Sequence, residues 1–276
     1  MEKIYGDVVL ITGASSGIGK ACAEHLKDKG YHVYGTSRRA WDDIKVEGKG
    51  GGFIKMVQMD VRDDASVKAA VEHIVDAEGG IDVAINCAGY ALAGAVEDTA
   101  PEEAMAEFDT NFFGVLRVCR AVLPHMRRKG RGLIINISSV AGFFAIPYQS
   151  MYSASKYALE ALSQAMRMEV KPFGIKVALI EPGDVRTGFT ASRTWAEASK
   201  GDTPYKERCQ KAIAAMEKSE MNGPGPEIVV KALSKIIESK DPPIKTVVGA
   251  DYKFIAFLKR LVPDRFVEYV VNKMYS

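Results

Sequence analysis

The chain places three glycines between an apolar strand and a helix, an arrangement that few folds tolerate. Val8 to Ile11 is an unbroken apolar run, which is typical of a strand buried on both faces. Thr12-Gly13-Ala14-Ser15-Ser16-Gly17-Ile18-Gly19 follows, and a helical pattern begins at Gly17. Glycine tolerates positive φ and allows close approach of a ligand. Such a strand–turn–helix unit offers free N–H groups and a positive helix end to a pyrophosphate, so it predicts a dinucleotide site.

Short apolar strands alternate with helical patterns along most of the chain. We expect strands at 7–11, 32–37, 53–59, 83–86, 132–138, 175–181 and 245–248, and helices at 17–29, 64–77, 103–128, 151–173 and 227–239. This alternation predicts an α/β fold of the Rossmann type, with a doubly wound parallel sheet in three layers. We place no domain boundary within residues 1–276. The long helix is apolar nearly all round from Phe112 to Leu123, so we expect burial on most sides there.

Two segments depart from the alternation. Residues 186–226 are polar and end in Asn222-Gly223-Pro224-Gly225-Pro226, so we expect an irregular lid. Residues 251–276 form an amphipathic helical tail in which lysines and arginines are interspersed among large apolar side chains. Three interpretations stay open for this tail: it packs on the body or a second subunit, covers the substrate pocket, or rests on a membrane surface.

Composition narrows the class of protein. The 276 residues carry a formal net charge of +2 without a long basic cluster, so we expect no nucleic-acid partner. No apolar run approaches the roughly 20 residues that span a bilayer, and we see no secretory signal. The four cysteines are scattered and lack metal-like spacing. These features predict a soluble cytoplasmic protein without a metal site.

The end of the second strand indicates which dinucleotide is bound. An Asp or Glu there usually holds the ribose of NAD, whereas NADP needs partners for a 2′-phosphate. Here the strand ends in Ser37-Arg38-Arg39, which offers a hydroxyl and two guanidinium groups. We therefore predict NADP(H) over NAD(H), with Arg38 as the first candidate. Two further strand ends are expected to line the cofactor: Asp60-Val61 at the adenine edge, and Asn86-Cys87-Ala88-Gly89 beneath the backbone of the cofactor.

Tyr152 and Lys156 lie four residues apart and share one face of a predicted helix. An ammonium group near a phenol favours its ionised form, so the pair is suited to exchange a proton with a substrate hydroxyl. Ser138 and Ser139 end the fifth strand at the ligand-binding edge, where a hydroxyl can bond a carbonyl oxygen. Asn111 lies in the long helix under the same edge and is either a satisfied structural amide or the holder of a water that relays protons from Lys156.

Together these motifs resemble those of the short-chain dehydrogenase/reductase family. The glycine turn resembles the family's TGxxxGxG, and residues 152–156 fit its YxxxK. Residues 86–89 resemble NNAG, with Cys87 as the departure, and Pro182-Gly183 with Thr187 resembles PGxxxT. The resemblance implies strand order 3-2-1-4-5-6-7, a homodimer or homotetramer, and a catalytic tetrad of Asn111, Ser139, Tyr152 and Lys156. It also implies that the nicotinamide end lies at Pro182, Gly183, Val185 and Thr187.

One departure concerns the cofactor. Many NADP-using members carry a basic residue where this chain has Ser16, so the resemblance implies that Ser37 and Arg38 hold the 2′-phosphate largely alone. Within the family, residues 131–189 and 89–96 look most similar to 17β-hydroxysteroid and retinol dehydrogenases.

The expected substrate wall comes from residues 90–95, 140–151 and 190–226, the first two rich in apolar and aromatic side chains such as Phe143, Phe144, Ile146, Pro147 and Tyr148. We therefore expect an NADP(H)-dependent enzyme that interconverts a hydroxyl and a carbonyl on a small hydrophobic substrate, steroid-, retinoid- or lipid-like. Two alternatives stay open: a β-ketoacyl thioester reductase, and a non-catalytic module that senses NADPH.

Overall fold

The computed structural model describes residues 3–259 and 261–275. Residues 1–2, 260 and 276, which belong to the predicted domain and tail, lie outside the described residues. Within them, the strands are β1 (Val8–Thr12), β2 (His32–Ser37), β3 (Lys45–Glu47), β4 (Phe53–Gln58), β5 (Val83–Asn86), β6 (Leu92–Ala93), β7 (Gly132–Ile137), β8 (Ile175–Pro182), β9 (Thr194–Trp195) and β10 (Lys245–Val248). The helices are α1 (Gly17–Asp28), α2 (Asp64–Glu78), α3 (Pro101–Phe108), α4 (Gly114–Lys129), α5 (Ser150–Val170), α6 (Lys206–Asn222), α7 (Glu227–Ile237), α8 (Ala250–Leu258) and α9 (Asp264–Tyr275).

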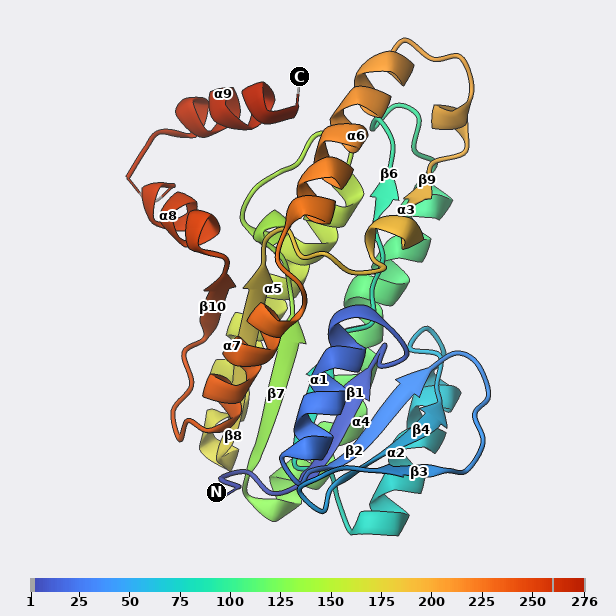
Figure 1. Ribbon diagram of the computed structural model, residues 1–276, viewed down its shortest axis with the longest axis vertical. Coiled ribbons are helices and arrows are strands. Elements are labelled where there is room, and N and C mark those ends of the chain that lie inside the picture. The colour runs from blue at the N-terminus through green and yellow to red at the C-terminus, as the bar shows by residue number, and fades with distance from the viewer. Residues whose placement is uncertain (1–2, 260, 276) are drawn as a thin grey trace.

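One sheet organises the molecule (Figure 1). Its order is β10-β8-β7-β5-β1-β2-β4-β3, and every pairing is parallel except that of β3 with β4. Numbered by the seven predicted strands, the parallel part runs 3-2-1-4-5-6-7, so the predicted fold and strand order are confirmed. The antiparallel edge strand β3 was not predicted. It has only three residues, all exposed, so burial leaves little pattern in its sequence.

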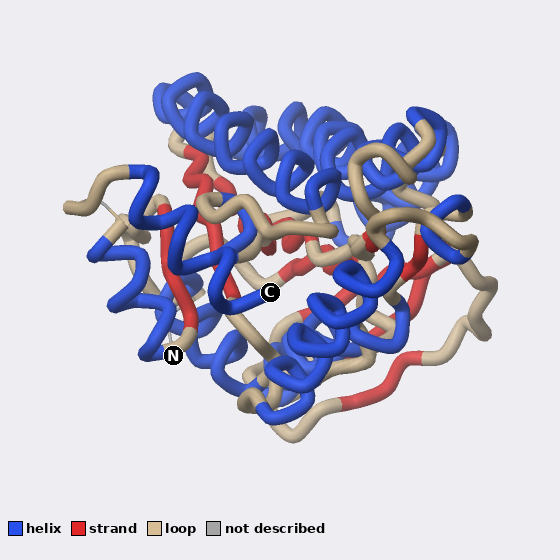
Figure 2. Tube along the Cα trace, turned by 90° about the horizontal axis from the view of Figure 1, so that it is seen from above, coloured by secondary structure: helices blue, strands red, loops and turns tan. Residues whose placement is uncertain are grey.

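Helices cover both faces of the sheet, as Figure 2 shows. Neighbouring residues along β1 point to opposite faces: Val9 and Ile11 pack with α1 and α7, whereas Val8 and Leu10 pack with α2, α4 and α5. Both clusters are apolar, which explains why β1 is an unbroken apolar run rather than an alternating one. The parallel strands all end at one edge of the sheet, and the turns that follow them gather there.

The predicted continuous helix over 103–128 is interrupted. It consists of α3, a π-helical turn at Asp109–Phe113, and α4. The π turn holds Asn111 buried, and π turns of this kind are frequent at functional sites. The expectation of burial on most sides was wrong at Phe113, which is 45% exposed at the end of the π turn, just before α4.

The lid contains a helix that its polar sequence did not predict, and the tail is helical as expected. The lid contains α6, a helix that buries Cys209, Ala212, Ile213 and Met216. Those four residues have the i, i+3, i+4, i+7 spacing of an amphipathic helix, which the surrounding charged residues obscure. The tail forms α8 and α9, separated near Pro263, a residue that cannot continue a helix. α9 contacts α6, while α8 begins directly after β10.

Candidate active site

A cavity of about 680 Å³ opens where the strands end, and most predicted site residues line it. From the glycine turn these are Gly13, Ser15, Ser16, Gly17, Ile18 and Gly19, and from later strand ends Ser37, Arg38, Asp60, Val61, Ala88, Gly89, Ser139, Tyr152, Lys156, Pro182, Gly183, Val185 and Thr187. Asn86 and Asn111 lie behind the wall, 2% and 1% exposed. Arg39 lies outside the cavity, with its guanidinium 3.9 Å from the centre of the Trp41 ring.

The glycine turn has the shape of a phosphate cradle. Gly13 has a φ of 68°, and a Cβ added to it would lie 2.9 Å from the Cα of Ala88. The chain after β5 therefore passes directly against the turn. Thr12 Oγ1 fixes this approach by accepting hydrogen bonds from the backbone nitrogens of Cys87 (2.9 Å) and Ala88 (3.0 Å). α1 begins at Gly17 without an acidic residue in its first turn, so its positive end faces the cavity uncompensated. These features fit a dinucleotide pyrophosphate.

Basic and hydroxyl groups gather at the end of β2. Arg38 lines the cavity, and its charge helps to lower the pKa of Asp60, although the hydrogen bond from Arg62 is the larger cause. Ser37 Oγ accepts a hydrogen bond from Trp41 Nε1 at 2.7 Å. Arg62, which the sequence interpretation did not include, also lines the cavity and forms a bidentate ion pair with Asp60. Its position two residues after Asp60 at a strand end was the signal available in the sequence.

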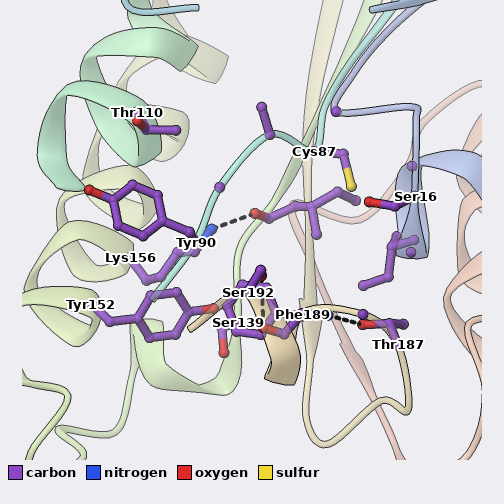
Figure 3. Close-up of a pocket in the computed structure, with 18 of the residues that line it drawn as sticks. Ser16, Cys87, Tyr90, Thr110, Ser139, Tyr152, Lys156, Thr187, Phe189 and Ser192 are labelled. Carbon is purple, nitrogen blue, oxygen red and sulfur yellow. Dashed lines mark hydrogen bonds between the residues drawn. The ribbon is translucent and has the colours of Figure 1, made fainter. Parts of the chain in front are cut away.

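The tetrad residues predicted from the sequence are brought together by α5, β7 and the π turn. Figure 3 shows the Tyr152 hydroxyl pointing toward Ser139, and both residues line the cavity. Lys156 Nζ lies 5.6 Å from the centre of the Tyr152 ring and donates a hydrogen bond to the backbone oxygen of Ile137 at 3.0 Å. The amide of Asn111 accepts a hydrogen bond from Tyr90 N (3.1 Å) and donates to Tyr90 O (2.9 Å).

Burial dominates the protonation of this group. Desolvation raises the pKa of the Tyr152 phenol above its ordinary value, and the Ser139 side chain opposes that shift. Desolvation also lowers the pKa of Lys156 to about 8. The phenol is therefore protonated at neutral pH in the absence of a bound cofactor. A neutral phenol can donate a proton to a carbonyl oxygen.

Glu107, which the sequence interpretation missed, is completely buried in the last turn of α3, two residues before the π turn. Its Oε1 accepts a hydrogen bond from Leu92 N at 3.0 Å, while its Oε2 has no hydrogen-bond partner among the described residues. Burial raises the pKa of this carboxyl to about 8. Glu107 thus ties α3 to β6 beside the cavity. The surrounding Phe108 and Phe112 were the only sequence signal that this acidic residue sits in an apolar setting.

The substrate end of the cavity is formed by three segments, as expected, but by fewer of their residues. Val140, Ile146 and Gln149 come from the loop before α5, and Tyr90 and Leu92 from the segment around β6. Ser192, Thr194, Trp195 and Glu220 come from the lid. Phe143 and Phe144 instead pack against each other and near Lys259 of the tail. Tyr252 at the start of α8 packs on Gly183 and lines the cavity, so the tail contributes to one wall.

Comparison with known proteins identifies the family. The model of the short chain dehydrogenase family matches residues 7–198. The chain belongs to this family. It is 43% identical over 270 residues, 98% of both chains, to the 3-ketodihydrosphingosine reductase of Bacteroides thetaiotaomicron. It is 38% identical over 191 residues to human 17-beta-hydroxysteroid dehydrogenase type 1, covering 66% of this chain and 58% of that one. A short-chain dehydrogenase from Streptomyces avermitilis has a TM-score of 0.79 at 31% identity and 93% coverage of both chains.

Family membership fixes the general chemistry. The chain is an oxidoreductase of CH–OH and C=O groups that binds a nicotinamide cofactor. The family prediction and the relation to hydroxysteroid dehydrogenases are confirmed. Among the described residues, every helix is too short or too polar to cross a membrane.

Proposed function

We propose that this protein is an NADPH-dependent reductase of a ketone on a long-chain lipid base, with Tyr152 as the proton donor. The observation that carries the proposal is the meeting of the Tyr152 and Ser139 hydroxyls on a cavity wall that continues into Leu92, Ile146 and Trp195. The hydroxyls suit a carbonyl oxygen, and the apolar side chains suit an alkyl chain. The identity with a 3-ketodihydrosphingosine reductase over nearly the whole chain favours a lipid over a steroid.

The proposed mechanism uses four side chains. The nicotinamide, when bound, supplies the hydride to the carbonyl carbon. The substrate oxygen lies between the hydroxyls of Tyr152 and Ser139, and Tyr152 donates its proton as negative charge develops there. Lys156 holds positive charge beside the phenol, which stabilises the phenolate that remains. Asn111 fixes the chain at Tyr90 and also donates a hydrogen bond to Ser155 Oγ, on the helix that carries Tyr152 and Lys156.

The proposed preference for NADP(H) rests on Arg38, because no carboxylate ends β2. A guanidinium at this place favours a 2′-phosphate over a ribose hydroxyl. Arg62 adds a second positive charge at the same wall, although Asp60 neutralises most of it.

We propose a homodimer or homotetramer in the cytoplasm, with the tail resting on a membrane surface. Apolar side chains stay exposed on α5 and just before α4: Tyr157, Met168 and Phe113. On the tail, Phe254, Phe257, Leu261, Phe266 and Tyr269 are each more than half exposed. Exposed apolar side chains on a tail that also lines the cavity are suited to contact the membrane that would hold a lipid substrate. Light scattering tests the assembly. Sedimentation with anionic vesicles, compared with a Phe254→Ser/Phe257→Ser variant, tests the membrane contact.

The deciding experiment measures NADPH oxidation by the purified protein with three substrates: 3-ketosphinganine, a steroid ketone and an acetoacetyl thioester. We expect the highest kcat/KM with 3-ketosphinganine, the substrate also called 3-ketodihydrosphingosine. Preference for the thioester would instead support a β-ketoacyl reductase. If NADPH stabilises the protein but none of the three is reduced, and Tyr152→Phe changes nothing, the chain is a cofactor-sensing module.

A further inference from the structure

The lid carries a buried charge cluster that the proposed reaction does not use. The Arg193 side chain is 1% exposed and contacts two carboxylates of α6, Glu220 Oε1 at 2.5 Å and Glu217 Oε1 at 3.3 Å. With its amide oxygen turned toward the guanidinium, Gln149 accepts from Arg193 Nε at 2.8 Å. One guanidinium and two carboxylates leave one net negative charge in this cluster.

Glu220 is the member of the cluster that faces the substrate. It lines the cavity, whereas Glu217 is 43% exposed on its side chain and lies outside the cavity lining. Thr190 Oγ1 donates a hydrogen bond to Glu220 Oε2 at 2.6 Å, which holds the carboxylate in place. An ionised carboxylate accepts about four hydrogen bonds, so it retains acceptor capacity on the cavity side.

Glu220 lines the same cavity as the reacting group, and Arg193 joins its carboxylate to Gln149, three residues before Tyr152. Gln149, Tyr152 and Phe189 line the same cavity, and the Phe189 ring centre lies 5.8 Å from that of Tyr152. The charge of Glu220 raises the pKa of the Tyr152 phenol, and the charge of Arg193 lowers it. Arg193 compensates one of the two carboxylate charges, so the cluster keeps one negative charge, which favours a cation at this wall of the cavity. An ammonium group next to the substrate carbonyl would supply that cation.

We propose that Glu220 binds the ammonium group of the substrate on the carbon next to the ketone, and so selects 2-amino ketones over ketones without an amine. This inference rests on the proposed function, since it assigns the polar end of the same substrate. Glu220 is thereby a specificity-determining residue, and Arg193, Thr190 and Gln149 are positioning residues that hold its carboxylate at the cavity wall.

The test compares two ketones of equal chain length, 3-ketosphinganine and its analogue without the amine, in wild type and Glu220→Gln. We expect wild type to prefer the amine, and the variant to lose roughly 10- to 100-fold in kcat/KM on the amine alone, mainly through KM. Glu207→Gln is the matched control, because Glu207 is exposed on the same helix. It should leave both substrates unchanged.

Two outcomes would overturn the assignment of Glu220, and a third would overturn the proposed function. Equal losses on both ketones would mean that Glu220 only anchors the lid through Arg193. Unchanged kinetics in Glu220→Gln would show that the carboxylate does not meet the amine. If wild type reduces neither ketone, the proposed function itself fails, which is a different result from failure of the Glu220 assignment.

Discussion

Lys156 Nζ donates a hydrogen bond to the backbone oxygen of Ile137 at 3.0 Å, two residues before Ser139, and so joins α5 directly to the end of β7. The lysine is 6% exposed, and its burial lowers its pKa to about 8. The ammonium form therefore predominates below that pH, and the neutral amine above it. A charged lysine is the form that stabilises a phenolate at Tyr152.

This relationship predicts the pH dependence of reduction. The rate under kcat/KM conditions should fall as pH rises through about 8, because Lys156 loses its proton there. In Lys156→Arg the guanidinium stays charged, so the decline should move to higher pH whatever the loss of absolute rate. Stopped-flow or steady-state rates between pH 6 and 10 measure both profiles.

Glu107 provides the control for that profile, because burial raises its pKa to about 8 as well. Glu107→Gln removes this titration while keeping an acceptor for Leu92 N. If the fall in kcat/KM above about pH 8 persists in Glu107→Gln, Lys156 accounts for it. If the fall disappears, the buried carboxyl of Glu107 controls the rate and the Lys156 explanation is wrong.

Removing the Tyr152 hydroxyl should separate chemistry from binding. Tyr152→Phe keeps the ring contact with Phe189 but deletes the proton donor. General acid catalysis contributes typically 10²- to 10⁴-fold, so we expect kcat to fall by at least about 100-fold. NADPH titration followed by fluorescence should give an affinity within a few-fold of wild type. A variant that retains most of its turnover would exclude Tyr152 as the acid.

Two adjacent arginines permit a matched test of cofactor choice. Arg38 lines the cavity, whereas Arg39 stacks on Trp41 outside it. Arg38→Ala should remove most of the difference between NADPH and NADH in thermal stabilisation, and Arg39→Ala should leave it unchanged. Equal stabilisation of wild type by the two cofactors would contradict the proposed preference for NADP(H).

Patterns of burial carried most of the sequence prediction. β1 and the other central strands are apolar because both faces are covered, and the glycine turn needs its glycines where Gly13 meets Ala88. Such positions constrain the residue type strongly, so the positions of these strands and of the cavity-lining turns follow from the sequence, whereas the strand order came from the family resemblance. The exposed strand β3 and the polar helix α6 impose weaker constraints, and the sequence interpretation missed them.

Ion pairs between residues far apart in the chain leave no pattern in the local sequence. Arg193 and Glu220 lie 27 residues apart, and each looks like an ordinary surface residue in a polar segment. Only the packing of α6 over the cavity makes Arg193 a buried cation with two partners. Glu107 is similar, since its partner Leu92 belongs to another element. Periodicity and motif spacing do not encode contacts of this kind.

Gly13 and Gly51 allow a matched test of the cofactor turn, because the backbone of Ala88 packs against Gly13 and no described atom packs against Gly51. Both Gly13 (φ 68°) and Gly51 (φ 77°) are left-handed, so alanine at either should cost about 1 kcal/mol in unfolding free energy from backbone strain. A Cβ at Gly13 would also meet Ala88 Cα at 2.9 Å, whereas one at Gly51 meets no described atom within 4 Å. Gly13→Ala should therefore be the less stable variant and lose thermal stabilisation by NADPH, while Gly51→Ala keeps it. Denaturant titration measures the stability of each variant, and thermal shift measures its stabilisation by NADPH. Equal stability and equal NADPH stabilisation of the two variants would contradict the placement of the turn in the cofactor site.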